Sequence, residues 1–180
     1  MELIGGNEMP ITQFNLANGQ RAERKLLITV AEWTEGTSQV REILGTRTED
    51  SSIEYNADIS TTTDIRGFNY TDLEKTQPQQ PFDPFLILGG SKLGAFLNDI
   101  RRRNAVSELN QFTMYIITAY VGTSGAYEAE KHTGCTITYD SLGGDTKVNF
   151  PITVYFSNNS VTGTVDKLTD DFQFTADASV

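Results

Sequence analysis

The residue types that support nucleophilic or acid–base catalysis are scarce in this sequence. It contains one histidine, His132, and one cysteine, Cys135, both in the segment YEAEKHTGCTITYD at 127–140. The segment has the alternation of a β-strand, in which residues three positions apart point to opposite faces. We therefore expect that the two side chains cannot pair and that neither a Ser–His–Asp nor a Cys–His arrangement forms. On these grounds we predict that the protein is not an enzyme.

Metal and phosphate sites are also poorly supported. One histidine and one cysteine cannot supply a zinc ligand set, and the pair Asp170 and Asp171 lacks the ligand spacing of a calcium loop. The sequence LGGSKLG at 88–94 superficially resembles a phosphate loop, but it lacks the Gly-Lys-Ser/Thr order of that motif. We expect no metal and no cofactor, and we interpret LGGSKLG as a flexible lead into a helix.

Charge and composition limit the remaining classes. The chain has 180 residues and a net charge of −10, with a sequence pI of about 4.5, which indicates one domain without a basic surface for nucleic acid. The lone cysteine excludes an internal disulfide. Residues 1–14 lack the basic and apolar regions of a secretory signal, and no apolar run is long enough to span a membrane. We expect a protein made in a cytoplasm, without a membrane partner.

Most of the chain has the two-residue alternation or the short apolar runs of β-strands. Residues 1–24 show no sustained period, so we expect an N-terminal arm with a short strand at 11–16 and a folded domain over 25–180. In the segment 51–59 we expect alternate residues to face inward: Ile53, Tyr55, Ala57 and Ile59. We predict strands at 25–33, 38–44, 51–59, 61–76, 112–122, 127–140, 147–157, 161–165 and 172–176.

One segment, from Ser91 to Asn104, has the period of a helix instead. Its apolar residues recur with the spacing of one helix face: Leu93, Phe96, Leu97 and Ile100. Ser91 is a favourable N-cap, and the last turn contains three residues whose charge opposes the helix dipole: Arg101, Arg102 and Arg103. We predict a helix over about 91–104 whose apolar face packs on a β-sandwich or small barrel, in a mainly β fold with one flanking helix and extended arms.

The segment TQPQQPFDP at 76–84 contains three prolines with little to bury. Proline removes a backbone donor and restricts the residue before it to extended conformations. We therefore expect an extended arm with little regular structure, within a longer loop around 68–90.

The segment EYNADISTTTDIRGFNYTDLEKTQPQQPFDPF at 54–85 resembles the corresponding part of the major tail tube proteins of tailed bacteriophages. In that family a strand rich in Asp and Thr runs into an arm that ends in Asp-Pro, and the single helix follows. The segments AYEAEKHTGCTITYDSLGGD at 126–145 and VTGTVD at 161–166 are similar to late hairpins of the same family. The resemblance covers about residues 25–166.

The resemblance implies a fold related to the tube proteins of type VI secretion systems. It also implies rings of six subunits whose sheets join into one inner β-barrel, and a stack of rings that conducts DNA into the host. Such a structural protein belongs to the virion, in the phage tail, and assembles in the host cytoplasm; we favour a non-contractile tail. Its partners would be further copies of itself and the tape measure, terminator and distal tail proteins. DNA would pass through the lumen without specific binding.

Two sets of residues follow from the resemblance and the strand alternation. The polar faces of the strands at 52–66 and 127–140 are expected to line the lumen with carboxylates that repel DNA: Glu54, Asp58, Asp64, Glu128 and Glu130. For any one of them the outer surface is an equal alternative. Contacts between subunits or rings are expected from residues 1–24, from the proline arm and from the helix end: Pro78, Pro81, Arg101, Arg102 and Arg103.

Three other classes remain open. A tail terminator or a connector to the head would share much of the fold. A monomeric β-sandwich binding module, such as a sugar-binding domain, would favour clustered exposed Trp and Tyr residues, whereas the only tryptophan, Trp33, lies in an expected core strand. An enzyme on a β scaffold is disfavoured because no catalytic constellation is present.

Overall fold

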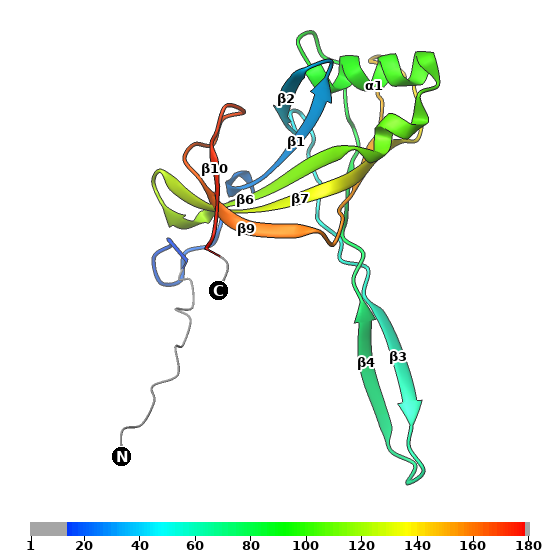
Figure 1. Ribbon diagram of the computed structural model, residues 1–180, viewed down its shortest axis with the longest axis vertical. Coiled ribbons are helices and arrows are strands. Elements are labelled where there is room, and N and C mark those ends of the chain that lie inside the picture. The colour runs from blue at the N-terminus through cyan, green and yellow to red at the C-terminus, as the bar shows by residue number, and fades with distance from the viewer. Residues whose placement is uncertain (1–13, 179–180) are drawn as a thin grey trace.

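A long antiparallel hairpin of β6 (Phe112–Thr123) and β7 (Ala126–Tyr139) organises the computed structural model, which describes residues 14–178 (Figure 1). The main sheet is antiparallel and has the order β10-β9-β7-β6-β1-β2. The strands that flank the hairpin are β1 (Leu27–Glu35), β2 (Ser38–Ile43), β9 (Ser160–Val165) and β10 (Phe174–Ala176). The protein is mainly β, as its sequence predicts.

Strand β7 changes partner along its length. Its first half pairs with β9, and its second half pairs with β8 (Ile152–Tyr155), which pairs in turn with β5 (Gln79–Phe82). Between the two halves Gly134 forms a bulge with a φ of +74°, a conformation that glycine adopts without steric cost. Because of this change of partner, β5 and β8 form a second layer.

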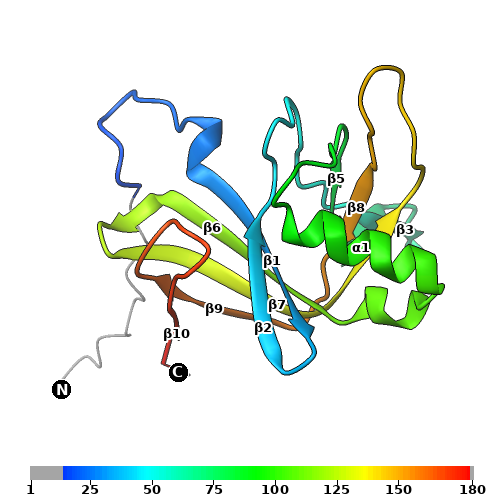
Figure 2. The ribbon, with the colours of Figure 1, turned by 90° about the horizontal axis from the view of Figure 1, so that it is seen from above.

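The one α-helix within residues 14–178, α1 (Lys92–Arg103), packs over one face of the main sheet (Figure 2). Leu93, Leu97 and Ile100 are fully buried, while Phe96 is partly buried and stacks on Trp33 with ring centroids 5.5 Å apart. The Ser91 hydroxyl accepts the N–H of Gly94, as the sequence indicates for an N-cap. The helix therefore covers the apolar face that β1 and β6 present.

The opposite face of β6 is covered by the C-terminal segment 166–174. Tyr115 and Ile117 on this face pack with Val30, Val165 and Phe172 in a second buried cluster. Strand β6 is thus buried on both faces, which explains why its sequence is apolar without alternation.

The remaining described helices are two short 3-10 turns, η1 (Arg24–Leu26) and η2 (Val106–Asn110). In the part of the chain that the structure describes, none of the helices has both the length and the apolar character needed to cross a membrane.

Strands β3 (Asp58–Thr63) and β4 (Asn69–Lys75) form a separate two-stranded sheet that projects from the body (Figure 1). We call residues 58–75 the arm. The prediction that 51–59 is one core strand with Tyr55 and Ile59 inward is wrong, because these residues are 60% and 58% exposed. Alternation alone cannot distinguish a core strand from a free hairpin whose apolar side chains have no cover in the same molecule.

The prediction of an irregular proline arm over 76–84 is also wrong, since β5 lies in that segment with Gln80 and Phe82 buried. The Gln80 side chain accepts a hydrogen bond from Thr29 Oγ1 at 2.8 Å, which links β5 to β1. Pro81 is tolerated because β5 pairs as a strand only with β8, and its other side makes a single bridge, from Gln79 to Glu54. The projecting segment is therefore 58–75, and it precedes the prolines.

Replacing Leu97 by Ala should lower the free energy of unfolding by about 2–5 kcal/mol, because it leaves a cavity beneath the helix. The same change at Leu142, which is 45% exposed, should cost less than about 1 kcal/mol. Urea denaturation of both variants measures the difference. Equal destabilisation would show that α1 does not pack on the core.

Candidate functional site

His132 and Cys135 lie on the same face of β7, which corrects the expectation of opposite faces. The bulge at Gly134 inserts one residue, so that His132 lies opposite Met114 and Cys135 opposite Phe112. Both side chains contact the backbone of Ser157: His132 Nδ1 is 2.9 Å from its carbonyl oxygen, and the Cys135 sulfur accepts its N–H. The two residues therefore anchor the chain after β8 to β7.

The titration of these two groups is consistent with a structural role. Burial lowers the pKa of His132, but hydrogen bonds to Glu130 and Ser157 outweigh it and raise the pKa above its ordinary value. Burial raises the pKa of the Cys135 thiol, so the reactive thiolate is disfavoured. Neither side chain has the environment of an activated nucleophile.

The start of α1 is occupied by a carboxylate of the protein itself. Glu42 of β2 accepts the backbone N–H of Leu93 at 2.7 Å and the Ser91 hydroxyl at 2.9 Å. A phosphate would meet this negative charge at the helix N-terminus. Asp170 and Asp171 are paired with Lys92 and Lys167, and the described residues contain no group of three or more potential metal ligands.

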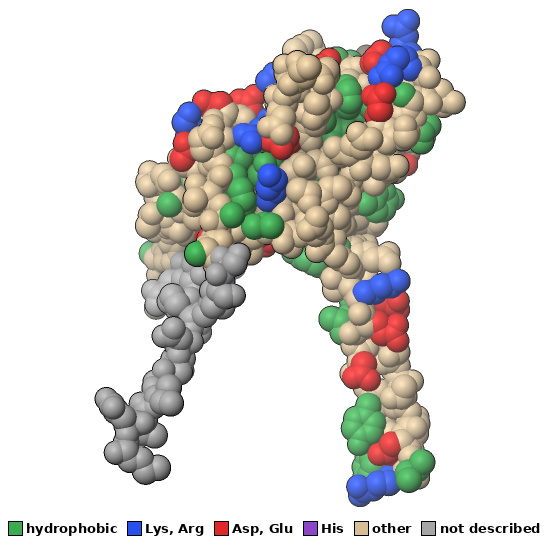
Figure 3. Space-filling view, in the orientation of Figure 1, with side chains coloured by type: hydrophobic (Ala, Val, Ile, Leu, Met, Phe, Trp, Pro, Cys, Tyr) green, Lys and Arg blue, Asp and Glu red, His purple; other side chains and the backbone are tan. Residues whose placement is uncertain are grey.

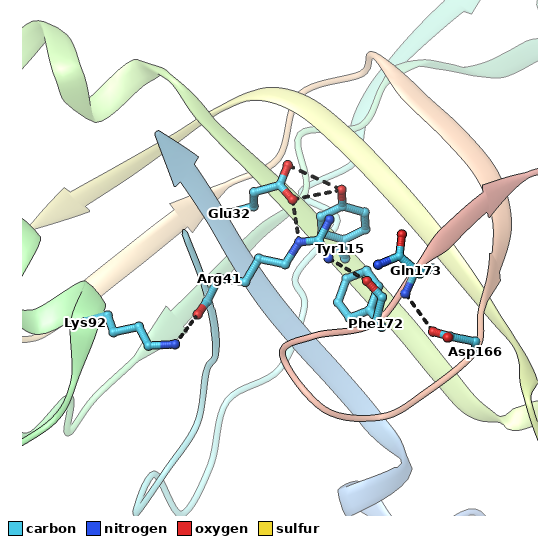
Figure 4. Close-up of polar contacts among 7 residues, drawn as sticks. All are labelled: Glu32, Arg41, Lys92, Tyr115, Asp166, Phe172 and Gln173. Carbon is cyan, nitrogen blue, oxygen red and sulfur yellow. Dashed lines mark hydrogen bonds and ion pairs between the residues drawn. The ribbon is translucent and has the colours of Figure 1, made fainter. Parts of the chain in front are cut away.

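The main buried ionic cluster joins β1, β2 and β6 to the C-terminal segment (Figure 4). Arg41 Nε lies 2.5 Å from the Glu32 carboxylate, and Arg41 also donates to the Phe172 carbonyl at 2.7 Å. The guanidinium stacks over the Phe172 ring at 4.4 Å, and the Tyr115 hydroxyl donates to Glu32. Because every member bonds within the cluster, it fastens residues 166–174 over the sheet and offers no free catalytic group.

The arm leaves large apolar side chains exposed. Five large residues on it are each more than half exposed: Ile59, Ile65, Phe68, Tyr70 and Leu73. Figure 3 shows hydrophobic side chains gathered toward the far end of the arm. Clusters of exposed apolar side chains commonly mark interaction surfaces, and an isolated two-stranded hairpin is marginal in water. The arm is therefore the main candidate for a binding surface.

The turn at the end of the arm is held in shape by Asp64. Its carboxylate accepts the backbone N–H groups of Arg66 at 2.8 Å and Phe68 at 2.9 Å, and the Tyr70 hydroxyl at 3.2 Å. The bond from Phe68, with smaller contributions from the others, lowers the pKa of Asp64 below its usual value. Asp64 therefore preforms the turn before any partner binds.

The five carboxylates predicted to line a lumen do not lie on one surface. Glu54 bridges to Gln79 at the root of the arm, Asp58 lies at its base near Lys75, and Asp64 lies in its turn. Glu128 and Glu130 instead face outward from β7 in the main sheet. Because β3 belongs to the two-stranded sheet of the arm and β7 to the main sheet, the two strands do not form one wall within a single molecule. The lining of a lumen stays a prediction.

Around Glu128 and Glu130 the main sheet presents a polar, acidic surface. The two carboxylates line a shallow hollow of about 300 Å³ without Lys or Arg among its lining residues. The other lining side chains that carry oxygen are Thr118, Thr162, Thr164 and Asp177. We call this set the acidic sheet face. Sequence reasoning missed the contribution of β9, which the alternation of VTGTV at 161–165 could have indicated.

The predicted contact residues also separate into two groups. Arg101, Arg102 and Arg103 are exposed at the C-terminal end of α1. Arg103 is paired with Asp99 and Glu108. Pro78 and Pro81 lie in the body, where their carbonyl oxygens accept from Phe156 N and Ser51 Oγ. The backbone of both prolines therefore takes part in hydrogen bonds within the chain. The projecting segment is the arm at 58–75, whereas the sequence analysis expected it at 76–84.

The fold and these surfaces define a mainly β protein with one helix, a projecting hairpin and an acidic sheet face. No protein-family model matches the sequence, and a comparison with curated proteins finds no similar sequence.

Replacing Asp64 by Ala should speed hydrogen exchange at the Arg66 and Phe68 amides, because both lose their acceptor. The same change at exposed Asp72 should leave these two amides unchanged. Hydrogen bonding lowers the pKa of Asp64 in the folded state. The stabilisation of the turn by its carboxylate is therefore present above the usual pKa of 3.8 and is lost as pH falls through the folded value. NMR exchange measurements on the monomer test this, and equal rates in both variants would contradict it.

Burial, followed by the charge of Glu32, raises the pKa of Tyr115 from 10.0 to about 12. The folded state favours the neutral Tyr115 hydroxyl. Its contribution to the free energy of unfolding is therefore present below pH 10 and is lost as pH rises toward 12. The free energy of unfolding should fall by about 2 kcal/mol more over this range in the wild type than in Tyr115→Phe. The control is Tyr155→Phe at an exposed site, and parallel curves for all three proteins would refute the prediction.

Proposed function

We propose that the protein is a self-assembling structural subunit, a major tail tube protein of a tailed phage. In this role rings of six copies stack into a tube through which DNA passes. The role is structural and needs no catalytic step, metal or cofactor. The observation that carries the proposal is the preformed arm with its exposed apolar side chains.

The arm favours assembly over a monomeric binding module. Ile59 lies directly opposite Leu73, so the two form an apolar pair on one face, while Ile65 and Phe68 extend the apolar surface to the turn. Burying a side chain of this size against a partner contributes about 1.5–3 kcal/mol. A monomer would leave all of this surface in water, whereas an oligomer of identical copies supplies cover for every arm.

The edges of the main sheet support lateral association. Strands β2 and β10 each pair on one side only within the described residues, so both present unpaired backbone groups. Such edges invite pairing with another chain, and closure into a ring removes them. Joining β2 of one copy to the β10 side of the next would continue the sheet around a ring.

The acidic sheet face suits a channel wall. Glu128 and Glu130 lie on it without a neighbouring Lys or Arg, and Lys131 belongs to the opposite face, where it lies over the Tyr115 ring. Repeated around a ring, these carboxylates repel phosphate and keep DNA mobile. In this proposal Glu128 and Glu130 line the bore, while the carboxylates of the arm take part in contacts between copies.

Electron microscopy of the purified wild-type protein in negative stain tests the proposal. We expect long tubes with a central channel. Single closed rings would point to a tail terminator or a connector, and monomers at high concentration would contradict assembly altogether.

Removing the arm should abolish tubes without unfolding the body. Asp58 and Lys75 are cross-strand partners, so an Asn-Gly turn can replace residues 59–74 and close the hairpin at its base. We expect a melting temperature within a few degrees of the wild type and no tubes in the microscope. Normal tubes from this variant would show that the arm is dispensable.

A further inference from the structure

The arm and the C-terminal end of α1 lie at opposite ends of the longest axis of the molecule (Figure 1). A copy displaced along this axis would therefore bring its helix end toward the arm of the first copy. The two regions also differ in charge: Lys and Arg side chains gather at the helix end (Figure 3), whereas residues 58–75 contain four Asp or Glu residues and two Lys or Arg residues.

The helix end is a concentrated positive region on an acidic protein. Its last turn carries three consecutive arginines, although the net charge of the chain is −10. Arg103 is held by Asp99 and Glu108 within the chain. Arg101 and Arg102 make no ion pair within residues 14–178, and Val106 beside them is 53% exposed. This end of the molecule can therefore accept carboxylates and an aromatic ring.

One face of the arm carries that chemistry. Tyr70 and Asp72 alternate along β4, so their side chains share a face, while Leu73 points to the other. Glu74 follows as the extra residue of a β-bulge, between Leu73 opposite Ile59 and Lys75 opposite Asp58, so it lies next to this face at the base of the arm. Tyr70 is 54% exposed, and neither carboxylate forms an ion pair with another described residue. Arginine binds carboxylates through paired hydrogen bonds and stacks on tyrosine rings. The match is thus specific in residue type as well as in sign.

Resting on the proposed function, we infer that this face of the arm docks on Arg101 and Arg102 at the end of α1 in a copy of the adjoining ring. The contact joins two different surfaces of the same chain, so it does not close on itself and can repeat along one axis. Six such contacts between two rings would add up, which allows each to be weak by itself.

Charge reversal on each side tests the inference. The helix variant carries Arg101→Glu and Arg102→Glu, and the arm variant carries Asp72→Arg and Glu74→Arg. All four positions are exposed, so circular dichroism should show wild-type folding. Sedimentation and negative-stain microscopy measure the protein concentration at which tubes form. For each variant alone this concentration should be at least about tenfold higher than for the wild type. A control with Arg47→Glu and Lys147→Glu, at exposed sites in other loops and with the same change in net charge as the helix variant, should assemble normally.

Mixing the two variants is the decisive step. The reversed arm of one variant matches the reversed helix end of the other, and the unchanged surfaces match as well. An equimolar mixture should therefore form tubes at the wild-type concentration, and so should one chain that carries all four changes.

The outcomes separate the inference from the proposed function. Wild-type assembly by both reversed variants, or loss of tubes that neither the mixture nor the fourfold variant restores, would overturn the docking while wild-type tubes still support the function. A wild type that forms no tubes would overturn both.

Discussion

Strand β6 is apolar on both faces, and the rest of the fold is arranged to cover it. On one face α1 supplies Leu93, Leu97 and Ile100; on the other the C-terminal segment supplies Phe172, held in place by the Arg41–Glu32 pair. Both α1 and the C-terminal segment lie in the body of the molecule, away from the arm. The chain therefore completes its core without the arm, whose large apolar side chains remain exposed.

The arm is nevertheless ordered by its own interactions. Asp64 binds two backbone N–H groups in the turn, and the Thr63 hydroxyl donates to Asn69 across the strands. A segment that is already shaped loses less conformational entropy when it binds, so more of its burial energy contributes to association. In the proposed assembly, the open edges at β2 and β10 would direct association around a ring, and the arm would direct it along an axis.

Local patterns in the sequence predicted the parts of the fold that local physics determines. The spacing of Leu93, Phe96, Leu97 and Ile100 with the Ser91 cap predicted α1, and the apolar run over 112–122 predicted a doubly covered strand. The errors concern information that alternation does not contain. Alternation does not show whether another element packs on the apolar face of a strand, as for Tyr55 and Ile59. It also does not show where a bulge shifts the two-residue period, as at Gly134. The same limit applies to the candidate site, because the acidic sheet face can be predicted only when the pairing of β7 with β9 is known. The resemblance to tail tube proteins stays a prediction.

The central claim is that other copies of the chain cover the arm. A cryo-electron microscopy structure of the assembled protein, at a resolution that shows side chains, tests it most directly. The account predicts that Ile59, Phe68 and Leu73 are buried against neighbouring copies and that Glu128 and Glu130 face a central channel. An assembly in which the arms project freely into solvent, or whose bore is lined mainly by lysine and arginine, would contradict it.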